Sequence, residues 1–246
     1  MSDKNMTILQ HLEELRKVLI ISLISLIPTT LIAWLFRDYL LGILINPLRE
    51  KSPDFSLKFF GPTEAFFTFL KLSVASGFIL ALPIILYQVW KFVLPALKQN
   101  EKKVLLLVVP SSMLLFIGGI IFAYFTVFKI ALFFFLGFGG EFADPLLRLS
   151  DYLSFTITFL LPFGLVFQLP LVIFFLTKLD IISPQVLAKK RKYALFIIII
   201  VSTILTPPDI ISQLLMSGPV YLLYEVSIWI SLIVGRKKKK KLSVQD

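Results

Sequence analysis

Long, nearly uninterrupted apolar segments dominate this sequence. Two of them, residues 64–94 and 104–136, run for 31 and 33 residues. A helix needs about 20 apolar residues to cross the roughly 30 Å hydrocarbon core of a membrane, whereas the strands of a membrane barrel alternate over about 10 residues. With 57% apolar residues and a mean hydropathy of +0.89, the chain has more apolar surface than a soluble fold of 246 residues buries. We therefore predict an all-α integral membrane protein.

The apolar segments and the loops between them predict one membrane domain with six transmembrane helices, covering residues 1–246. The spans are expected at residues 18–36, 64–94, 104–136, 152–177, 193–205 and 210–234, followed by a basic C-terminal tail, 236–246. Their unequal lengths, and three prolines in residues 37–63, predict tilted helices that form a stiff, curved scaffold. The last two helices are expected to be short, because Pro207 and Pro208 end one and Gly218-Pro219 interrupts the other.

The fourth span is the one most expected to bend. It contains Pro162, Gly164 and Pro170, which favour a kink, and it places Gln168 near the bilayer centre. An amide at that depth needs a polar partner or water. We therefore expect this face of the span to meet a polar cavity or another subunit.

Basic residues are distributed unequally between the two sides that this topology defines. The two terminal segments and the loops on their side hold 17 of the 25 Lys and Arg residues, whereas the opposite loops hold five. Short loops rich in Lys and Arg stay in the cytoplasm, so both termini are predicted to be cytoplasmic. The net charge of +10 is explained by this topology and by contact with anionic lipid, and no nucleic-acid partner is predicted.

The sequence lacks the residues and motifs that several kinds of chemistry require. The chain has no cysteine and a single histidine, so we expect no disulfide and no metal site. It contains no Gly-rich phosphate loop, no Gly-x-Ser-x-Gly and no His-Glu-x-x-His pattern. We predict neither catalysis nor a cofactor, and we interpret His11 as a solvated residue of an N-terminal helix.

Three stretches of the sequence carry more specific information. They are His11–Arg16 (HLEELR), Ala81–Glu101 (ALPIILYQVWKFVLPALKQNE) and Leu205–Gln213 (LTPPDIISQ). Together they resemble the signature stretches of TatC, the multi-span core subunit of the twin-arginine protein translocase. The resemblance extends from about Leu9 to Ile233, with matching span order and loop lengths.

The resemblance implies a receptor for twin-arginine signal peptides in the cytoplasmic (inner) membrane of a prokaryote. Such a receptor self-associates in a larger complex and works with single-span subunits of the TatA and TatB type. The complex moves folded proteins across the membrane with the proton-motive force. The signal-peptide site that the resemblance implies consists of Glu14, Arg16, Leu19, Pro83, Phe92 and Glu101. The chemistry agrees, because two neighbouring guanidinium groups need two spaced carboxylates, and the planar fork of arginine binds a carboxylate through two hydrogen bonds.

A second set of polar residues is implied to meet partner subunits within the membrane. The set consists of Gln168, Thr206, Asp209 and Gln213. Many relatives carry a glutamate where this chain has Gln168, and an arginine where it has Val18. Because an amide does not titrate, we expect Gln168 to form hydrogen bonds with a partner and not to relay protons.

An alternative function of another class is a secondary transporter or proton channel. Glu64, Lys71 and Glu225 are ionisable residues in or near the predicted spans, which is typical of ion pathways. Transporters usually contain repeated halves with broken helices at the midplane. The first three spans of this chain do not resemble the last three, so the translocase is preferred.

Overall fold

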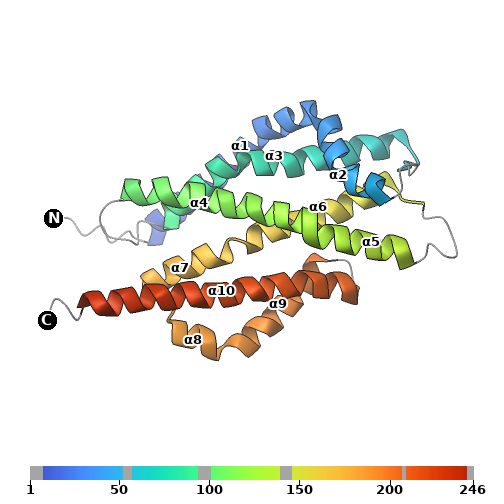
Figure 1. The fold of residues 1–246 in the computed structure, drawn as a ribbon. Helices are drawn as coiled ribbons and strands as arrows, with labels where there is room; N and C mark the ends of the chain where they lie inside the picture. Colours follow the sequence, from blue (N-terminus) through green and yellow to red (C-terminus); the bar gives the residue numbers. More distant parts are fainter. Residues whose placement is uncertain (1–7, 52–56, 94–100, 139–145, 207–208, 243–246) are drawn as a thin grey trace. The chain divides into compact units, whose positions relative to one another are not determined.

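The computed structural model describes residues 8–51, 57–93, 101–138, 146–206 and 209–242, and almost all of them are helical (Figure 1). The helices are α1 (Ile8–Leu35), α2 (Arg37–Lys51), α3 (Pro62–Val93), α4 (Glu101–Phe122), the π-helix η2 (Ala123–Phe128), α5 (Lys129–Phe138), α6 (Leu149–Val166), α7 (Leu169–Lys178), α8 (Pro184–Lys189), α9 (Arg191–Leu205) and α10 (Ile210–Leu242). The chain divides into two compact units. One consists of Met1–Leu44 and Gly61–Met113, and the other of Ile45–Phe60 and Leu114–Asp246.

Five helical segments are long and apolar enough to cross a membrane. They are Leu9–Leu35, Pro62–Val93, Leu106–Gly137, Leu149–Lys178 and Ile210–Gly235. The prediction of an all-α membrane protein is therefore confirmed. The predicted span 193–205 lies on α9, which has 15 residues, or about 22 Å of helix.

The prediction that both of the last two helices are short is wrong for the second one. Helix α10 runs for 33 residues and contains Pro219. Proline removes one backbone hydrogen bond, a loss that membrane helices tolerate, so Gly218-Pro219 does not interrupt α10. The helix also continues beyond Gly235 to Leu242, into the residues predicted to form a basic C-terminal tail.

The first unit is built on the pairing of α1 with α3, which run antiparallel. Ser73, Gly77 and Ala81, spaced four residues apart on α3, are all buried. A Cβ atom added to Gly77 would lie 2.7 Å from the Cα of Thr30, so the two backbones meet at this point. Small residues that allow such close approach are a common basis for helix pairing in membranes.

In the second unit, aromatic side chains fill the space between η2 and α6. Phe128 packs against Phe155 with ring centroids 5.8 Å apart, and the rings of Phe155 and Phe159 continue the cluster at 5.4 Å. Gly164 makes room for the fully buried ring of Phe116, which a Cβ atom at that position would approach to 2.7 Å. The predicted kink in the fourth span lies at Phe167 and Gln168, which form a two-residue turn between α6 and α7 within the segment Leu149–Lys178.

Polar side chains attach α7 and α8 to α10. The buried hydroxyl groups of Thr177 on α7 and Ser231 on α10 lie 2.7 Å apart. The hydroxyl of Tyr224 on α10 donates a hydrogen bond to the carbonyl of Leu187 on α8 at 2.9 Å. Helix α10 is thus the element on which the neighbouring helices of the second unit are assembled.

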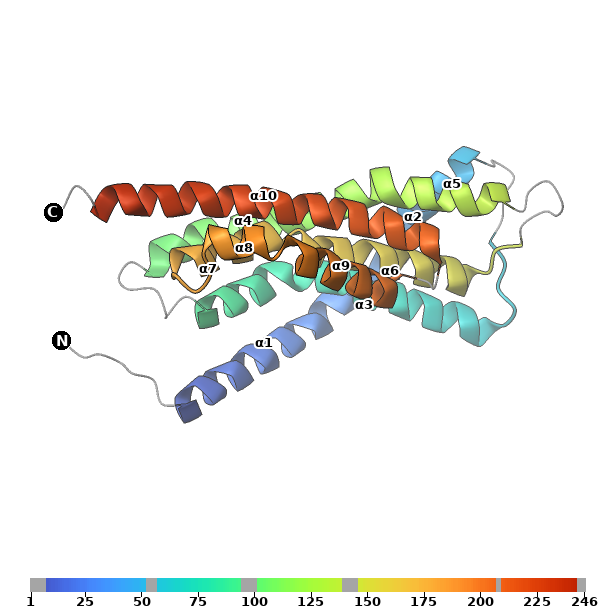
Figure 2. The ribbon, with the colours of Figure 1, turned by 90° about the horizontal axis from the view of Figure 1, so that it is seen from below.

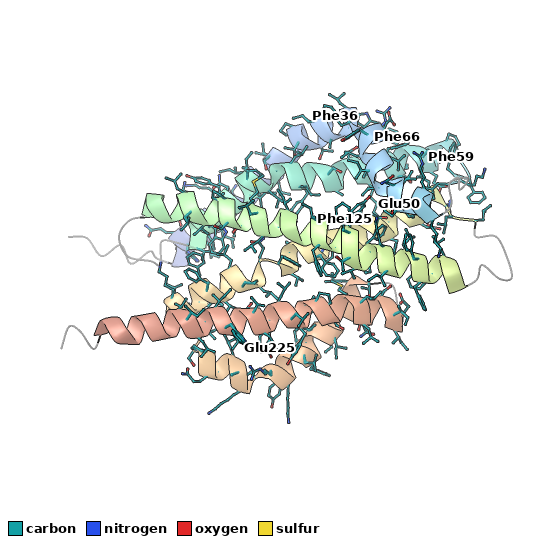
Figure 3. The ribbon with its side chains drawn as sticks, viewed as in Figure 1. Phe36, Glu50, Phe59, Phe66, Phe125 and Glu225 are labelled. Atoms are coloured by element: carbon teal, nitrogen blue, oxygen red, sulfur yellow. The ribbon has the colours of Figure 1, made fainter. Side chains whose placement is uncertain are left out.

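The segment that follows α1 is largely helical and is attached to α5 by charged side chains. Glu50 accepts a hydrogen bond from Lys129 at 2.7 Å, and Lys51 donates to the carbonyl of Phe133 at 2.9 Å. Glu50 is labelled on α2 in Figure 3. Further along, Lys58 and Arg148 form an isolated β-bridge. These contacts give this part of the second unit several fixed attachment points.

Candidate functional site

The residues predicted on the N-terminal part of α1 lie on different faces of the helix. Glu14 is half-buried, as are Val18 and Ser22 at four-residue intervals after it, and this stripe continues to the residues that pack on α3. Arg16 is exposed, and Leu19 is 54% exposed. The predicted lead-in and the first span form one continuous helix, so Glu14 is held on a regular scaffold.

The C-terminal end of α3 brings Phe92 to this part of α1. The ring of His11 stacks on the ring of Phe92, with centroids 4.3 Å apart and an angle of 20° between the planes. Glu14 follows His11 by three residues and is therefore its neighbour on the surface of α1. His11, which was predicted to be solvated, is exposed, and its ring is the group that contacts Phe92 near Glu14.

Pro83 lies on the same helix as Phe92 but at a different position along the helix axis. It is half-buried within α3, nine residues before Phe92, which corresponds to about 14 Å along the helix axis. Pro83 is therefore a residue of the span that leads to the site, at a distance from the ring stack.

Helix α4 begins at Glu101, whose side chain lies outside the described part of the structure. The helix itself is tied to α3 by a buried hydrogen bond, in which the indole N–H of Trp90 donates to the hydroxyl of Ser112 at 2.6 Å. Trp90 precedes Phe92 by two residues. The same end of α3 is therefore joined to both helices that carry the predicted carboxylates.

Glu14 is available to a ligand from outside the chain. It forms no ion pair or hydrogen bond within the five described ranges. The nearby cationic residues Arg16, Lys17 and Lys91 are all exposed. A half-buried carboxylate beside an aromatic stack is suited to bind a guanidinium group, which forms charge-assisted hydrogen bonds and stacks on rings.

Three of the four predicted partner-binding residues, Thr206, Asp209 and Gln213, lie at the turn between α9 and α10, and with the residues that they contact they make up a polar cluster. Gln213 donates hydrogen bonds to the hydroxyl of Thr203 at 2.6 Å and to the carbonyl of Ile199 at 3.3 Å. Thr206 is buried and donates to the carbonyl of Ser202. Asp209 stands before the first residue of α10, and its Oδ1 accepts the N–H of Ser212 at 2.6 Å.

Two atoms of this cluster are buried without a hydrogen bond to any residue that the structure describes. They are Oδ2 of Asp209 and Oγ of Ser212. Gln168 lies on another element, in the turn between α6 and α7, where it is half-buried. Its expected exposure to a cavity or partner stays a prediction.

Comparison with known proteins decides the family of the chain. Residues 10–219 match the family model described as Sec-independent protein translocase protein (TatC). The chain belongs to the TatC family. The TatC protein of Carboxydothermus hydrogenoformans is 49% identical over 239 residues, covering 97% of this chain and 98% of that protein. The TatC protein of Aquifex aeolicus is 41% identical over 237 residues, covering 96% and 98%.

A solved structure gives the same result for the fold. A crystal structure of the twin arginine translocase receptor TatC superposes with a TM-score of 0.83 at 41% identity, covering 91% of this chain and 99% of that one. The TatC fold that the sequence motifs implied is therefore confirmed. Like its relatives, the chain is a multi-pass membrane protein and a translocase component.

One charged group of this TatC-family chain was not assigned a role by the sequence motifs. Glu225, labelled on α10 in Figure 3, accepts two hydrogen bonds from the guanidinium group of Arg191, at 2.7 and 3.0 Å, and a third from the hydroxyl of Tyr221 at 3.0 Å. The hydrogen bonds to Glu225 raise the pKa of Arg191 above its usual range. The four-residue spacing of Tyr221 and Glu225, opposite a basic segment, is the sequence signal that points to this group.

The Arg191–Glu225 pair also bears on the transporter alternative. Glu225 accepts three hydrogen bonds, two from the permanent cation Arg191 and one from Tyr221, so its carboxylate is engaged within the chain. Glu225 is therefore a structural residue of the α9–α10 pair. Glu225 is one of the three ionisable residues on which the transporter interpretation was based, so one of them is explained by the fold. Membership of the TatC family argues against a transporter as well.

Proposed function

We propose that this chain is the signal-peptide receptor and core subunit of a twin-arginine translocase. In this role it binds the twin-arginine signal peptides of folded cargo proteins, which the complex moves across the membrane with the proton-motive force. The observation that carries the proposal is Glu14, a half-buried carboxylate next to the His11–Phe92 stack and without a partner among the described residues. Membership of a family of translocase proteins supports it.

Recognition follows from the chemistry of the arginine pair. One guanidinium group binds Glu14 and the other binds Glu101 at the start of α4. Successive side chains of an extended peptide point to opposite sides, about 3.3 Å apart along the chain, so two spaced carboxylates suit two neighbouring arginines. Charged hydrogen bonds of this kind contribute on the order of 1.5–3 kcal/mol each.

The apolar part of the signal peptide is proposed to lie along α1. Leu19, Leu23 and Ile27 follow one another at four-residue intervals, and their exposed fractions are 54%, 63% and 64%. Residues with this spacing lie on one side of a helix, so they form an apolar stripe that begins beside the charged site. Arg16 and Leu19 mark the start of this path.

The proposal places the chain in the cytoplasmic membrane of a prokaryote with both termini in the cytoplasm. It rests on the excess of Lys and Arg in the terminal segments and in the loops on the same side. Six membrane crossings satisfy this arrangement, with α9 as the short one. The chain contains no cysteine, so single cysteines at Lys4 and Asp246 test it: a membrane-impermeant thiol reagent added to intact cells is expected to leave both unlabelled.

The polar residues Gln168, Thr206, Asp209 and Gln213 are proposed to meet single-span TatA- or TatB-type subunits. The buried Oδ2 of Asp209, which has no hydrogen bond to any described residue, supports this, because a buried polar atom gains stability from a donor that a partner supplies. A photo-crosslinker at the half-buried Gln213 is expected to capture such a subunit. Crosslinkers at Ile181 and Gln185, which are exposed residues outside this cluster, serve as controls.

Binding of a labelled signal peptide tests the proposed function. The full chain in lipid nanodiscs is expected to bind a peptide with an Arg-Arg pair saturably, and a matched Lys-Lys peptide at least about tenfold more weakly, because lysine does not form the paired hydrogen bonds. Equal affinity for both peptides, or no saturable binding, would contradict the proposal.

A further inference from the structure

We propose that His11 is a positioning residue for the signal-peptide site and acts through its stack on Phe92. The inference rests on the proposed function and adds a residue to the site that it uses. His11 itself is not assigned a contact with the peptide. Its effect is to hold the N-terminal end of α1, and with it Glu14, at a fixed place relative to the end of α3.

The need for such a residue follows from the way α1 and α3 pair. Their backbones meet at Thr30 and Gly77. His11 lies 19 residues from Thr30, or about 28 Å along α1, and Phe92 lies 15 residues from Gly77, or about 22 Å along α3. Figure 2 shows the two helices drawing apart towards these ends. Small side chains suffice at the crossing, but only large ones span the wider gap.

The ring contact has the geometry of a specific interaction. The centroids of His11 and Phe92 are 4.3 Å apart and the planes deviate by only 20°. His11 is exposed, yet its ring lies nearly parallel to the ring of Phe92. Stacked aromatic pairs stabilise a contact beyond the area that they bury, so the stack restricts the motion of the α1 end.

Restriction of α1 matters because Glu14 lies one turn from His11. A carboxylate that is already in place loses less conformational freedom when a guanidinium group binds. Without the stack, the end of α1 would have to be ordered during binding. We expect the loss of the His11 ring to weaken signal-peptide binding by about three- to tenfold.

Peptide titrations with the full chain in nanodiscs test the binding effect. His11→Ala is expected to show the loss, whereas His11→Phe, which keeps an aromatic ring, is expected to stay within about twofold of wild type. In a double-mutant cycle, His11→Ala should add nothing to Phe92→Ala, because the histidine acts through the phenylalanine. Additive losses would mean that His11 touches the peptide itself and would overturn the positioning role.

A distance measurement tests the same role without any peptide. The chain lacks cysteine, so spin labels attached through Glu13→Cys and Lys91→Cys, two exposed positions on α1 and α3, report only on these helices. The distance distribution is expected to broaden in His11→Ala and to remain narrow in His11→Phe. An unchanged distribution, or unchanged peptide affinity in His11→Ala, would overturn the inference.

Peptide binding by the wild-type chain and by His11→Ala distinguishes a failure of the proposed function from a failure of the role of His11. A wild-type chain that binds no twin-arginine peptide would contradict the proposed function, and the role of His11 with it. A wild-type chain that binds the peptide, together with a His11→Ala variant that binds it equally well, would contradict only the inference about His11.

Discussion

Two glutamates on membrane helices of this chain differ in one decisive respect. Glu225 on α10 is saturated by its own chain, with two hydrogen bonds from Arg191 and one from Tyr221. Glu14 on α1 is half-buried like Glu225, yet it has no ion pair within the part of the chain that is described. The first carboxylate stabilises the fold, and the second is the one that we propose binds a ligand.

The Arg191–Glu225 pair is an example, within this chain, of the interaction that we propose for Glu14. Arg191 binds Glu225 through Nε and Nη2 at 2.7 and 3.0 Å, which is the paired geometry that arginine forms with a carboxylate. A signal-peptide arginine at Glu14 would repeat this interaction between two molecules. The surroundings also differ: α1 and α3 meet through small residues, whereas α10 holds its neighbours through polar side chains.

The largest effect on stability is expected from added volume where α1 and α3 meet. Gly77→Ala would place a Cβ atom 2.7 Å from the Cα of Thr30, so the helices must separate. Such overpacking costs about 1–3 kcal/mol, and we expect a lower melting temperature in detergent together with weaker peptide binding. Gly118→Ala is the matched control, because its Cβ would meet no atom within 4 Å. Equal behaviour of the two variants would contradict the close crossing.

A smaller loss is expected from breaking the Arg191–Glu225 pair. Arg191→Met leaves Glu225 without its cation, so the melting temperature is expected to fall by less than in Gly77→Ala. Affinity for the twin-arginine peptide should remain within about twofold of wild type, because the pair is structural. The exchange Arg191→Glu with Glu225→Arg is expected to recover part of the stability. Loss of peptide binding in Arg191→Met would contradict the claim that Glu225 is structural and that only Glu14 of the two glutamates serves binding.

The smallest effect is expected from a single hydroxyl group on α10. Tyr224→Phe removes the hydrogen bond to the carbonyl of Leu187, which is worth about 0.5–1.5 kcal/mol. Because that carbonyl also accepts the N–H of Lys190, the loss should lie near the lower limit. Tyr193→Phe, at an exposed residue, is the control for thermal unfolding. A larger change in Tyr193→Phe than in Tyr224→Phe would contradict the role of α10 as the assembly element.

The helical segments were predictable because a membrane requires long apolar runs, which hydropathy detects directly. The interruption at Gln168 was also predictable, because Pro170 has no N–H to continue the helix. The same argument failed at Pro219, because α10 continues through this proline. A proline marks a weak point in a helix, and packing decides whether the helix breaks there.

Contacts between distant segments were harder to predict than the segments themselves. Glu14 and Phe92 were assigned to one site through family motifs, and that shared site stays a prediction. The stack of His11 on Phe92 depends on the exact pairing of α1 with α3, which composition does not reveal. The small residues Ser73, Gly77 and Ala81 did contain the necessary signal, because their four-residue spacing places them on one face of α3.

The central proposal is that Glu14 and Glu101 bind the two arginines of a signal peptide, whereas Glu225 is bonded within its own chain. Titration of the full chain in nanodiscs with an Arg-Arg signal peptide tests it most directly, using Glu14→Gln, Glu101→Gln and Glu225→Gln side by side. We predict that the first two variants bind about tenfold or more weakly, equivalent to about 1.4 kcal/mol, and that Glu225→Gln binds like wild type. Unchanged affinity in both Glu14→Gln and Glu101→Gln, or an equal loss in all three variants, would contradict the account.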